Sequence, residues 1–345
     1  MIITVTLNPA LDLTYRVDAL VPHGTHRVAA VAERPGGKGL NVAAVLHALG
    51  EPVLATGLLG GSTGGRVTSL LAAEGVPAAF VPIADETRRT VAVADHDDAT
   101  GFWEPGPRVA AGEWAAFVAH FRDLLGGASV VALSGSLPPG VPVDGYATLI
   151  RLAVAAGVRT VLDTSGDALR YGLAAGPDLA KPNATELAAL VCAGPAPVGA
   201  GIAGVPLRSA RLSAGTTGPS PAGRGAAEAT VPHVPGGREG GDAAVVLEHG
   251  ARAVVVSRGP LGLLALTGEG AWRGVPPERL AGNPTGAGDA CVAALARGLR
   301  DRTPWPGLLA DAVALSAAAV VAPSAGAVDQ DTYRRLLPAV RVSVA

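Results

Sequence analysis

Short apolar runs alternate with stretches of helical periodicity along most of the 345-residue chain. Apolar runs too short for helices predict buried strands at 2–7, 53–58, 129–133, 159–163 and 253–257. Between them, apolar positions at helical spacing predict helices at 39–49, 66–74, 146–156 and 184–191. Strands that alternate with helices in this way form a mostly parallel central sheet flanked by helices on both faces, so we expect an α/β fold.

Three stretches break this alternation. Residues of about 12–32 and 88–103 carry apolar side chains at alternate positions with no helix between, which predicts the strands of a small separate sheet, a lid. Residues of about 194–241 are dense in Gly, Ala, Pro, Ser and Thr and have too few large apolar side chains to fold by themselves. We therefore expect one domain over residues 1–345, with a lid and a flexible low-complexity insertion.

Composition and charge argue against several classes of protein. The net charge is −2, the aromatic content is 3% and no basic cluster is present, so a nucleic-acid partner is not expected. The first residues, MIITVTL, have no basic region before the apolar run, which indicates a strand and a cytoplasmic protein without a signal peptide. The Ala- and Val-rich stretch 308–328 contains Asp311 and Pro323 and is expected to be a packed helix, not a membrane span. Cys192 and Cys291 have no metal-binding spacing and are expected to be buried free thiols.

The segment NPTGAGD at 283–289 carries the most chemistry. Apolar positions at helical spacing follow it, so Gly286, Ala287 and Gly288 lie where a loop becomes a helix. Backbone N–H groups at a helix N-terminus bind phosphate oxygens, and Asp289 adds a carboxylate at the same place. An anion-binding turn beside a general base suits phosphoryl transfer to a hydroxyl group. For this motif alone, the alternative is a glycine turn capped by a solvated aspartate.

Lysine and asparagine are rare in this chain, and all of them occur in four short motifs. They are Lys38, Lys181, Asn8, Asn41, Asn183 and Asn283. The motifs, TLNP, GGKGLN, KPN and NPTGAGD, all contain Gly or Pro. Lysines and asparagines without a specific role would be scattered mostly over surface helices. We therefore expect that the six motif positions need these particular side chains.

Five motifs in this order resemble those of the PfkB/ribokinase family of carbohydrate kinases, and within it the 1-phosphofructokinase and tagatose-6-phosphate kinase branch. They are TLNPALD at 6–12, PGGKGLNVA at 35–43, SGSLPPG at 134–140, KPN with Glu186, and NPTGAGD. The resemblance covers nearly the whole chain apart from the insertion. It implies a ribokinase-like fold with a small β lid, ATP and Mg²⁺ as cofactors, and a homodimer formed through the lid.

The same resemblance implies residue roles on the sugar side. Asp289 takes the proton from the attacking hydroxyl, and the amides of 286–288 hold the charge of the transferred phosphoryl group. Sugar hydroxyls and their surroundings are contacted by Asp12, Gly36, Gly37, Asn41 and Ser136. Without the resemblance, Asp12 would be interpreted as a turn residue.

Three cations suit a phosphate already present on the sugar. Lys38 lies in a glycine turn beside the expected ring site, and an ammonium group binds phosphate strongly. Arg88 and Arg27 lie on the expected lid strands. Exposed arginines on a strand are otherwise simply solvated.

On the nucleotide side, Asn183 and Glu186 span a helix start. The resemblance implies that they organise Mg²⁺ through water near the ATP phosphates, while their spacing also suits a helix N-terminus with an acid in its first turn. The other implied nucleotide-side residues are Lys181, Ser257, Gly259, Gly262 and Asn283. For the adenine pocket, the sequence indicates a region, residues 316–326, but no individual residues.

The motifs favour a kinase that converts D-fructose 1-phosphate to fructose 1,6-bisphosphate. Tagatose-6-phosphate and fructose-6-phosphate kinases are alternatives, because a ketofuranose has a CH₂O group at either end and can turn over in one site. The segment GFWEPGP at 101–107 looks more like the tagatose-6-phosphate kinases. A non-catalytic sugar-phosphate sensor is an alternative of another class, but the base and the anion-binding turn are both intact.

Overall fold

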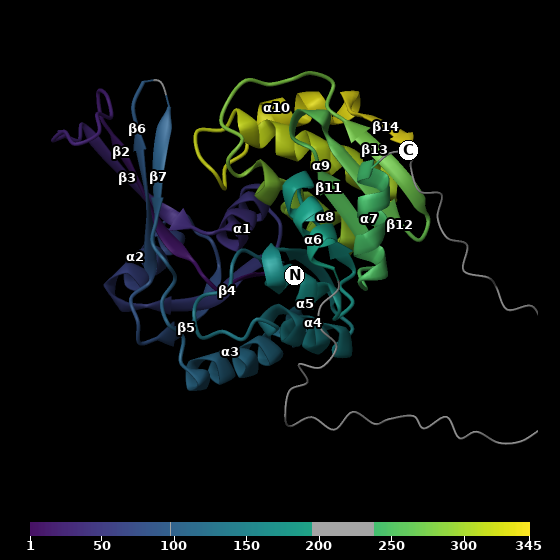
Figure 1. The fold of residues 1–345 in the computed structure, drawn as a ribbon, viewed down its shortest axis with the longest axis horizontal. Coiled ribbons are helices and arrows are strands. Elements are labelled where there is room, and N and C mark those ends of the chain that lie inside the picture. Colours follow the sequence, from purple (N-terminus) through teal and green to yellow (C-terminus); the bar gives the residue numbers. More distant parts are fainter. Residues whose placement is uncertain (97, 195–237) are drawn as a thin grey trace, which may run out of the picture.

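The computed structural model describes residues 1–96, 98–194 and 238–345. In these residues, a ten-stranded sheet has the order β14-β13-β12-β11-β10-β9-β8-β1-β4-β5 (Figure 1). The strands from β11 to β5 are parallel, and β12, β13 and β14 are antiparallel. Their bounds are β1 Ile2–Thr6, β4 Val53–Gly60, β5 Ala78–Ile83, β8 Val130–Ser134, β9 Arg159–Asp163, β10 Leu179–Ala180, β11 Ala253–Ser257, β12 Leu263–Thr267, β13 Gly270–Val275 and β14 Arg341–Val344.

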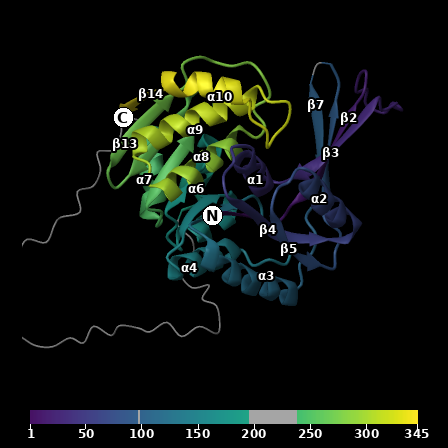
Figure 2. The same cartoon turned by 180° about the vertical axis from the view of Figure 1, so that it is seen from behind.

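Helices cover both faces of this sheet (Figures 1 and 2). One face packs against α1 Lys38–Ala48, α2 Gly61–Ala73, α8 Ala287–Asp301 and α9 Trp305–Val320, and α10 Gln330–Leu336 lies on α9. The other face packs against α3 Ala111–Leu124, α4 Gly145–Ala155, α5 Gly166–Leu173, α6 Ala184–Ala193 and α7 Arg238–Glu248. Neighbouring residues such as Val130 and Val131 belong to opposite cores. Strands buried on both faces explain the continuous apolar runs, and the expected α/β architecture is confirmed.

A second sheet of four strands, in the order β3-β2-β6-β7, extends from the main body (Figure 1). It consists of β2 Ala10–Arg16, β3 Ala30–Gly36, β6 Arg88–Ala94 and β7 Ala99–Trp103. The expected lid stretch 12–32 is thus two strands joined by a connection at 17–29. Because β3 ends at Gly36 and α1 begins at Lys38, the GGKG turn lies where the lid joins the body.

The described residues set limits on three further expectations. Residues 195–237 lie outside them, but 238–241 already form the first turn of α7, so the expected insertion is four residues too long at that end. Cys291 is buried as expected, whereas Cys192 on α6 is exposed, contrary to expectation. None of the helices in the described ranges has the length and apolar character needed to cross a membrane.

Candidate active site

The motif loops meet at the carboxyl ends of the parallel strands, where ligands bind in open α/β sheets. TLNP follows β1, SGSLPPG follows β8, and KPN follows β10. The N-terminus of α8 lies among them, since its first turn contacts residues next to β10 and in α1.

The turn before α8 requires glycine. Gly286 has a φ of 91°, and a Cβ there would lie 2.8 Å from the Cα of Ala325. The Ala287 amide donates to the carbonyl of Pro284 at 3.1 Å, so one of the three amides expected to face a phosphate closes the turn in this structure. A Cβ at Gly288 would be 3.6 Å from Nζ of Lys181, which places that ammonium group against the turn.

Asp289, in the first turn of α8, is buried. It accepts a hydrogen bond of 2.7 Å on Oδ2 from Nδ2 of Asn41. Burial and the carboxylate of Asp163 raise its pKa to about 6, while the Asn41 hydrogen bond, Lys38 and Lys181 act against this rise. Asp289 is therefore mostly ionised at neutral pH and close to the pKa that suits a general base. A solvated helix cap, the alternative interpretation, is wrong.

Both lysines of the chain converge on Asp163, a residue that sequence analysis missed. Nζ of Lys181 is 3.1 Å from Oδ1, and Nζ of Lys38 is 3.5 Å from Oδ2. Burial lowers the pKa of Lys181, but Asp163, together with Cys291 and Glu186, outweighs burial and holds that pKa above its ordinary value. The available signal was an aspartate at the carboxyl end of β9, directly after the apolar Val161 and Leu162.

Asn183 and Glu186 cap α6 reciprocally. The Glu186 amide donates to Asn183 Oδ1 at 2.8 Å, and the Asn183 amide donates to Glu186 Oε2 at 2.9 Å. The capping interpretation is therefore confirmed, and Glu186 Oε1 lies 3.9 Å from Nζ of Lys38. No group of three His, Cys, Asp or Glu side chains in the described ranges could hold a metal ion. This pair fits Mg²⁺ only through water.

On the lid side, Asp12 lies within β2 and not in a turn. It accepts hydrogen bonds from Thr90 Oγ1 and from Nε of Arg34, the latter at 3.3 Å. A Cβ at Gly36 would overlap its carboxylate at 2.0 Å, which explains the glycine. Arg34 was also missed, because one arginine on a strand carries no pattern of its own.

Asn8 connects two of the expected substrate residues. Its carbonyl accepts hydrogen bonds from Arg88 at 3.2 and 3.3 Å, and its Nδ2 donates to Ser136 Oγ at 3.1 Å. Arg27 is exposed in the connection beyond the Arg16–Ala30 end of the β2–β3 pair, whereas Asp12 lies toward the other end. The structure thus places Arg88 and Ser136 together and leaves Arg27 apart.

The remaining nucleotide-side residues shape the backbone. The Ser257 amide donates to the carbonyl of Pro182 at 3.1 Å, which fixes β11 beside the KPN turn. Gly262 has a φ of 85°, and a Cβ there would lie 2.0 Å from the carbonyl oxygen of Gly274, while Gly259 has open space around it. Asn283 Oδ1 accepts from the Thr285 amide at 2.9 Å.

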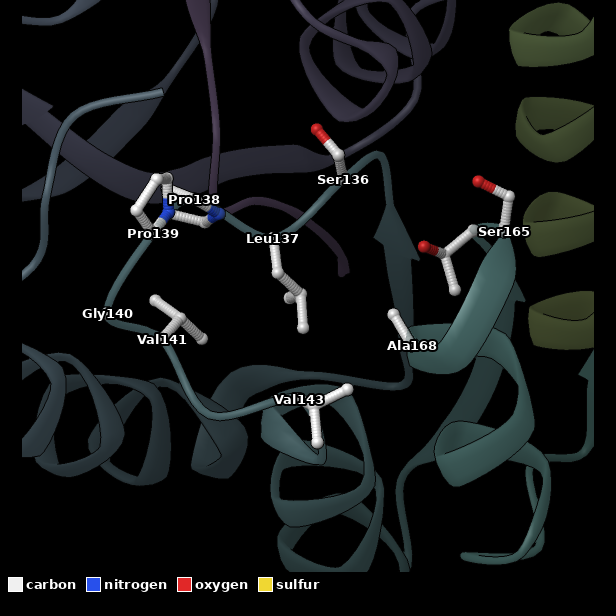
Figure 3. Close-up of a pocket in the computed structure, with 10 residues that line it drawn as sticks. Ser136, Leu137, Pro138, Pro139, Gly140, Val141, Val143, Ser165 and Ala168 are labelled. Carbon is white, nitrogen blue, oxygen red and sulfur yellow. The ribbon is translucent and has the colours of Figure 1, made fainter. Parts of the chain in front are cut away.

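A hollow of about 410 Å³ lies beside this cluster, between the loop after β8 and the start of α5. Figure 3 shows Leu137, Val143 and Ala168 around it, with Ser136 at the rim. Its lining contains hydroxyl groups but no charged side chain, so it does not suit a phosphate. The charged groups of the site lie outside this lining, although Asp163 directly precedes Thr164, which belongs to it.

A buried carboxylate beside a glycine turn at a helix start, on a ribokinase-like fold, defines a phosphotransferase. The chain belongs to the pfkB family of carbohydrate kinases, whose model matches residues 5–194 and 237–332 and leaves out most of the expected insertion. It is therefore a carbohydrate kinase, which transfers phosphate from ATP to a hydroxyl group of a sugar.

Solved structures of similar fold include proteins from Escherichia coli, Thermotoga maritima and Arabidopsis thaliana. Phosphofructokinase-2 from Escherichia coli, in complex with fructose-6-phosphate, is 30% identical with a TM-score of 0.78, over 98% of each chain. A possible 1-phosphofructokinase from Thermotoga maritima is 24% identical with a TM-score of 0.76, over 100% of this chain and 99% of the other. Ribokinase from Arabidopsis thaliana, with ribose and ATP, is 19% identical with a TM-score of 0.67, over 97% and 98%.

Proposed function

We propose that the protein is an ATP- and Mg²⁺-dependent kinase of a fructose monophosphate in the cytoplasm, and that Asp289 is its general base. The observation that carries the proposal is the buried Asp289 carboxylate, held by Asn41 at the glycine turn that begins α8. Asp289 accepts the proton of the attacking hydroxymethyl group, and the amides of Gly286 and Gly288 face the transferred phosphoryl group.

The cations divide between the two ends of this reaction. From the sequence, Lys38 is expected at the phosphate already on the sugar. Its Nζ lies 3.5 Å from Asp163 and 3.9 Å from Glu186, among the groups that act on Asp289, and this supports assigning it instead to the transferred phosphoryl group. We assign the phosphate already on the sugar to Arg88 and Ser136, and their shared contact with Asn8 supports this assignment. When bound, Mg²⁺ neutralises charge on the ATP phosphates, and Glu186 and Asn183 would hold it through water.

We propose fructose 1-phosphate as the sugar substrate, on the motif resemblance. Fructose 6-phosphate is a second candidate, because the 30% identical E. coli enzyme was solved with that sugar. A coupled assay of ADP release over fructose 1-phosphate, fructose 6-phosphate, tagatose 6-phosphate and fructose distinguishes them. The highest kcat/KM should belong to fructose 1-phosphate and the lowest to free fructose. Equal values for phosphorylated and free fructose would contradict the proposal.

We also propose a homodimer formed through the lid. Val31 on β3 and Phe102 and Trp103 on β7 are more than half exposed, which is unusual for large apolar side chains on one small sheet. Light scattering after size exclusion should give a dimer for the wild type and a monomer for Trp103→Asp. A monomeric wild type would contradict this part of the proposal.

A further inference from the structure

Arg34 is the one side chain described above that contacts the lid, α1 and the C-terminal region together. Its Nη2 lies 3.2 Å from Asp12 Oδ2 and donates to Asn41 Oδ1 at 2.5 Å, and its Nη1 donates to the carbonyl of Ala325. Only 20% of the side chain is exposed. An arginine used merely for solubility would extend into water, so these contacts need another explanation.

The contact with Asn41 determines how that amide is oriented. A carboxamide has an acceptor end and a donor end, whereas a guanidinium group has only donors. Arg34 must therefore face Oδ1 of Asn41, and this leaves Nδ2 to face Asp289. If the Asn41 amide were flipped, its oxygen would face the Asp289 carboxylate. Two hydrogen-bond acceptors would then lie against each other in a buried site without a donor between them.

The backbone around Arg34 supports a fixed position. Its strand pairs Arg34 directly with Asp12 across β2 and β3. The loop that contains Ala325 packs against both Gly286 and Asn41. A Cβ at Gly286 would lie 2.9 Å from Cβ of Ala325, and a Cβ at Gly326 would lie 3.2 Å from Oδ1 of Asn41. Arg34 is thus anchored at both ends of its guanidinium group.

We propose that Arg34 is a positioning residue, which fixes the Asn41 amide so that its N–H faces Asp289. This inference rests on the proposed role of Asp289 as the base. The charged groups that face Asp289 are Asp163 from β9, Lys38 from α1 and Lys181 after β10. Arg34 differs from these because its charge is paired with Asp12, so it acts on Asp289 through Asn41.

The expected effect is a change in pH dependence. Loss of the Asn41 hydrogen bond removes one of the interactions that hold the Asp289 pKa down, so the base becomes protonated at higher pH. In Arg34→Met, the acid midpoint of kcat should rise by about one pH unit, which makes the variant about tenfold slower at low pH and less affected at high pH. The phosphate of the substrate also ionises in this pH range, but it does so equally for the wild type and all variants. It therefore does not affect the difference between their acid midpoints of kcat.

Five variants test the inference, namely Arg34→Met, Arg34→Lys, Arg66→Met, Asn41→Ala and the double variant of Asn41→Ala with Arg34→Met. Arg66→Met is the control, because Arg66 pairs with Glu33 beside Arg34, at 2.6 Å and half exposed, and should leave the midpoint unchanged. In an Asn41→Ala background, Arg34→Met should add no further shift. Arg34→Lys keeps a donor and should restore part of the wild-type profile. A ¹³C NMR titration of the Asp289 carboxyl group in the ligand-free protein should follow the same shifts.

An equal loss of activity at every pH in Arg34→Met would overturn the inference, and so would a further shift in the Asn41→Ala background. Both outcomes leave the proposed function intact if Asp289→Asn is inactive. An active Asp289→Asn would instead overturn the proposed role of the base.

Discussion

Nδ2 of Asn41 donates a 2.7 Å hydrogen bond to Oδ2 of Asp289, which joins the first helix to the start of α8 across 248 positions of sequence. The contact places a hydrogen-bond donor on a buried carboxylate that Asp163, Lys38 and Lys181 also face, and these groups together predict how the carboxylate titrates. Burial favours the protonated form, while Asn41 and the two lysines favour the ionised form.

Asp289 should therefore titrate near pH 6 in the ligand-free protein, well above an ordinary aspartate. A ¹³C NMR titration of carboxyl-labelled aspartates measures this directly, and the spectrum of Asp289→Asn assigns the resonance. Since the base acts only when ionised, activity should rise with pH through this range. A midpoint near pH 4 would contradict the environment described for this group.

Arg88 and Arg89 are adjacent on β6 and provide a matched pair. Arg88 contacts the Asn8 carbonyl beside Ser136, whereas Arg89 pairs with Glu104 at 2.9 Å and is 54% exposed. Arg88→Met should raise KM for the fructose monophosphate by roughly 10- to 100-fold, since a charge-assisted hydrogen bond contributes about 1.5–3 kcal/mol. Arg89→Met should change KM less than about twofold. Steady-state kinetics of both variants measure these KM values. A similar rise in KM for the two variants would show that Arg88 does not bind the phosphate of the sugar.

Asp163 holds two lysines, one of them buried, so its loss should be costly. Asp163→Ala leaves Lys181 buried without its partner and should lower the free energy of unfolding by about 3–5 kcal/mol. Urea unfolding followed by circular dichroism measures the change. The control is Asp167→Ala, which removes an exposed partner of Arg170 and should change stability by no more than about 1 kcal/mol. Equal stability of the two variants would show that the pair at Asp163 contributes little.

Sequence patterns predicted five of the ten strands of the main sheet, β1, β4, β8, β9 and β11, because parallel strands buried on both faces leave continuous apolar runs. They did not predict the antiparallel β12, β13 and β14, the two-residue β10, or β5, in which Pro82 interrupts a short run. At the site, the motifs identified Asp289 and Asn41, but Asp163 and Arg34 act through partners distant in sequence. Such pairs become visible only when the fold brings them together.

The low-complexity segment is predicted to be dispensable. The family match omits residues 195–236, and their composition lacks large apolar side chains. Replacing residues 196–236 with a short Gly/Ser linker should leave kcat and the melting temperature nearly unchanged, because loop-closure entropy varies slowly with length. Amide hydrogen exchange and kinetics on the shortened protein test this prediction. Loss of activity, or protected amides across the segment in the full chain, would contradict it.

The central claim is that Asp289 is the general base of a sugar-phosphate kinase, and Asp289→Asn tests it most directly. The substitution keeps the size of the side chain and removes its ability to take a proton. With fructose 1-phosphate and ATP, kcat should fall by at least about 10²-fold, while the sugar phosphate still binds with nearly the wild-type dissociation constant. A purified Asp289→Asn protein that turns over at close to the wild-type rate would contradict the account.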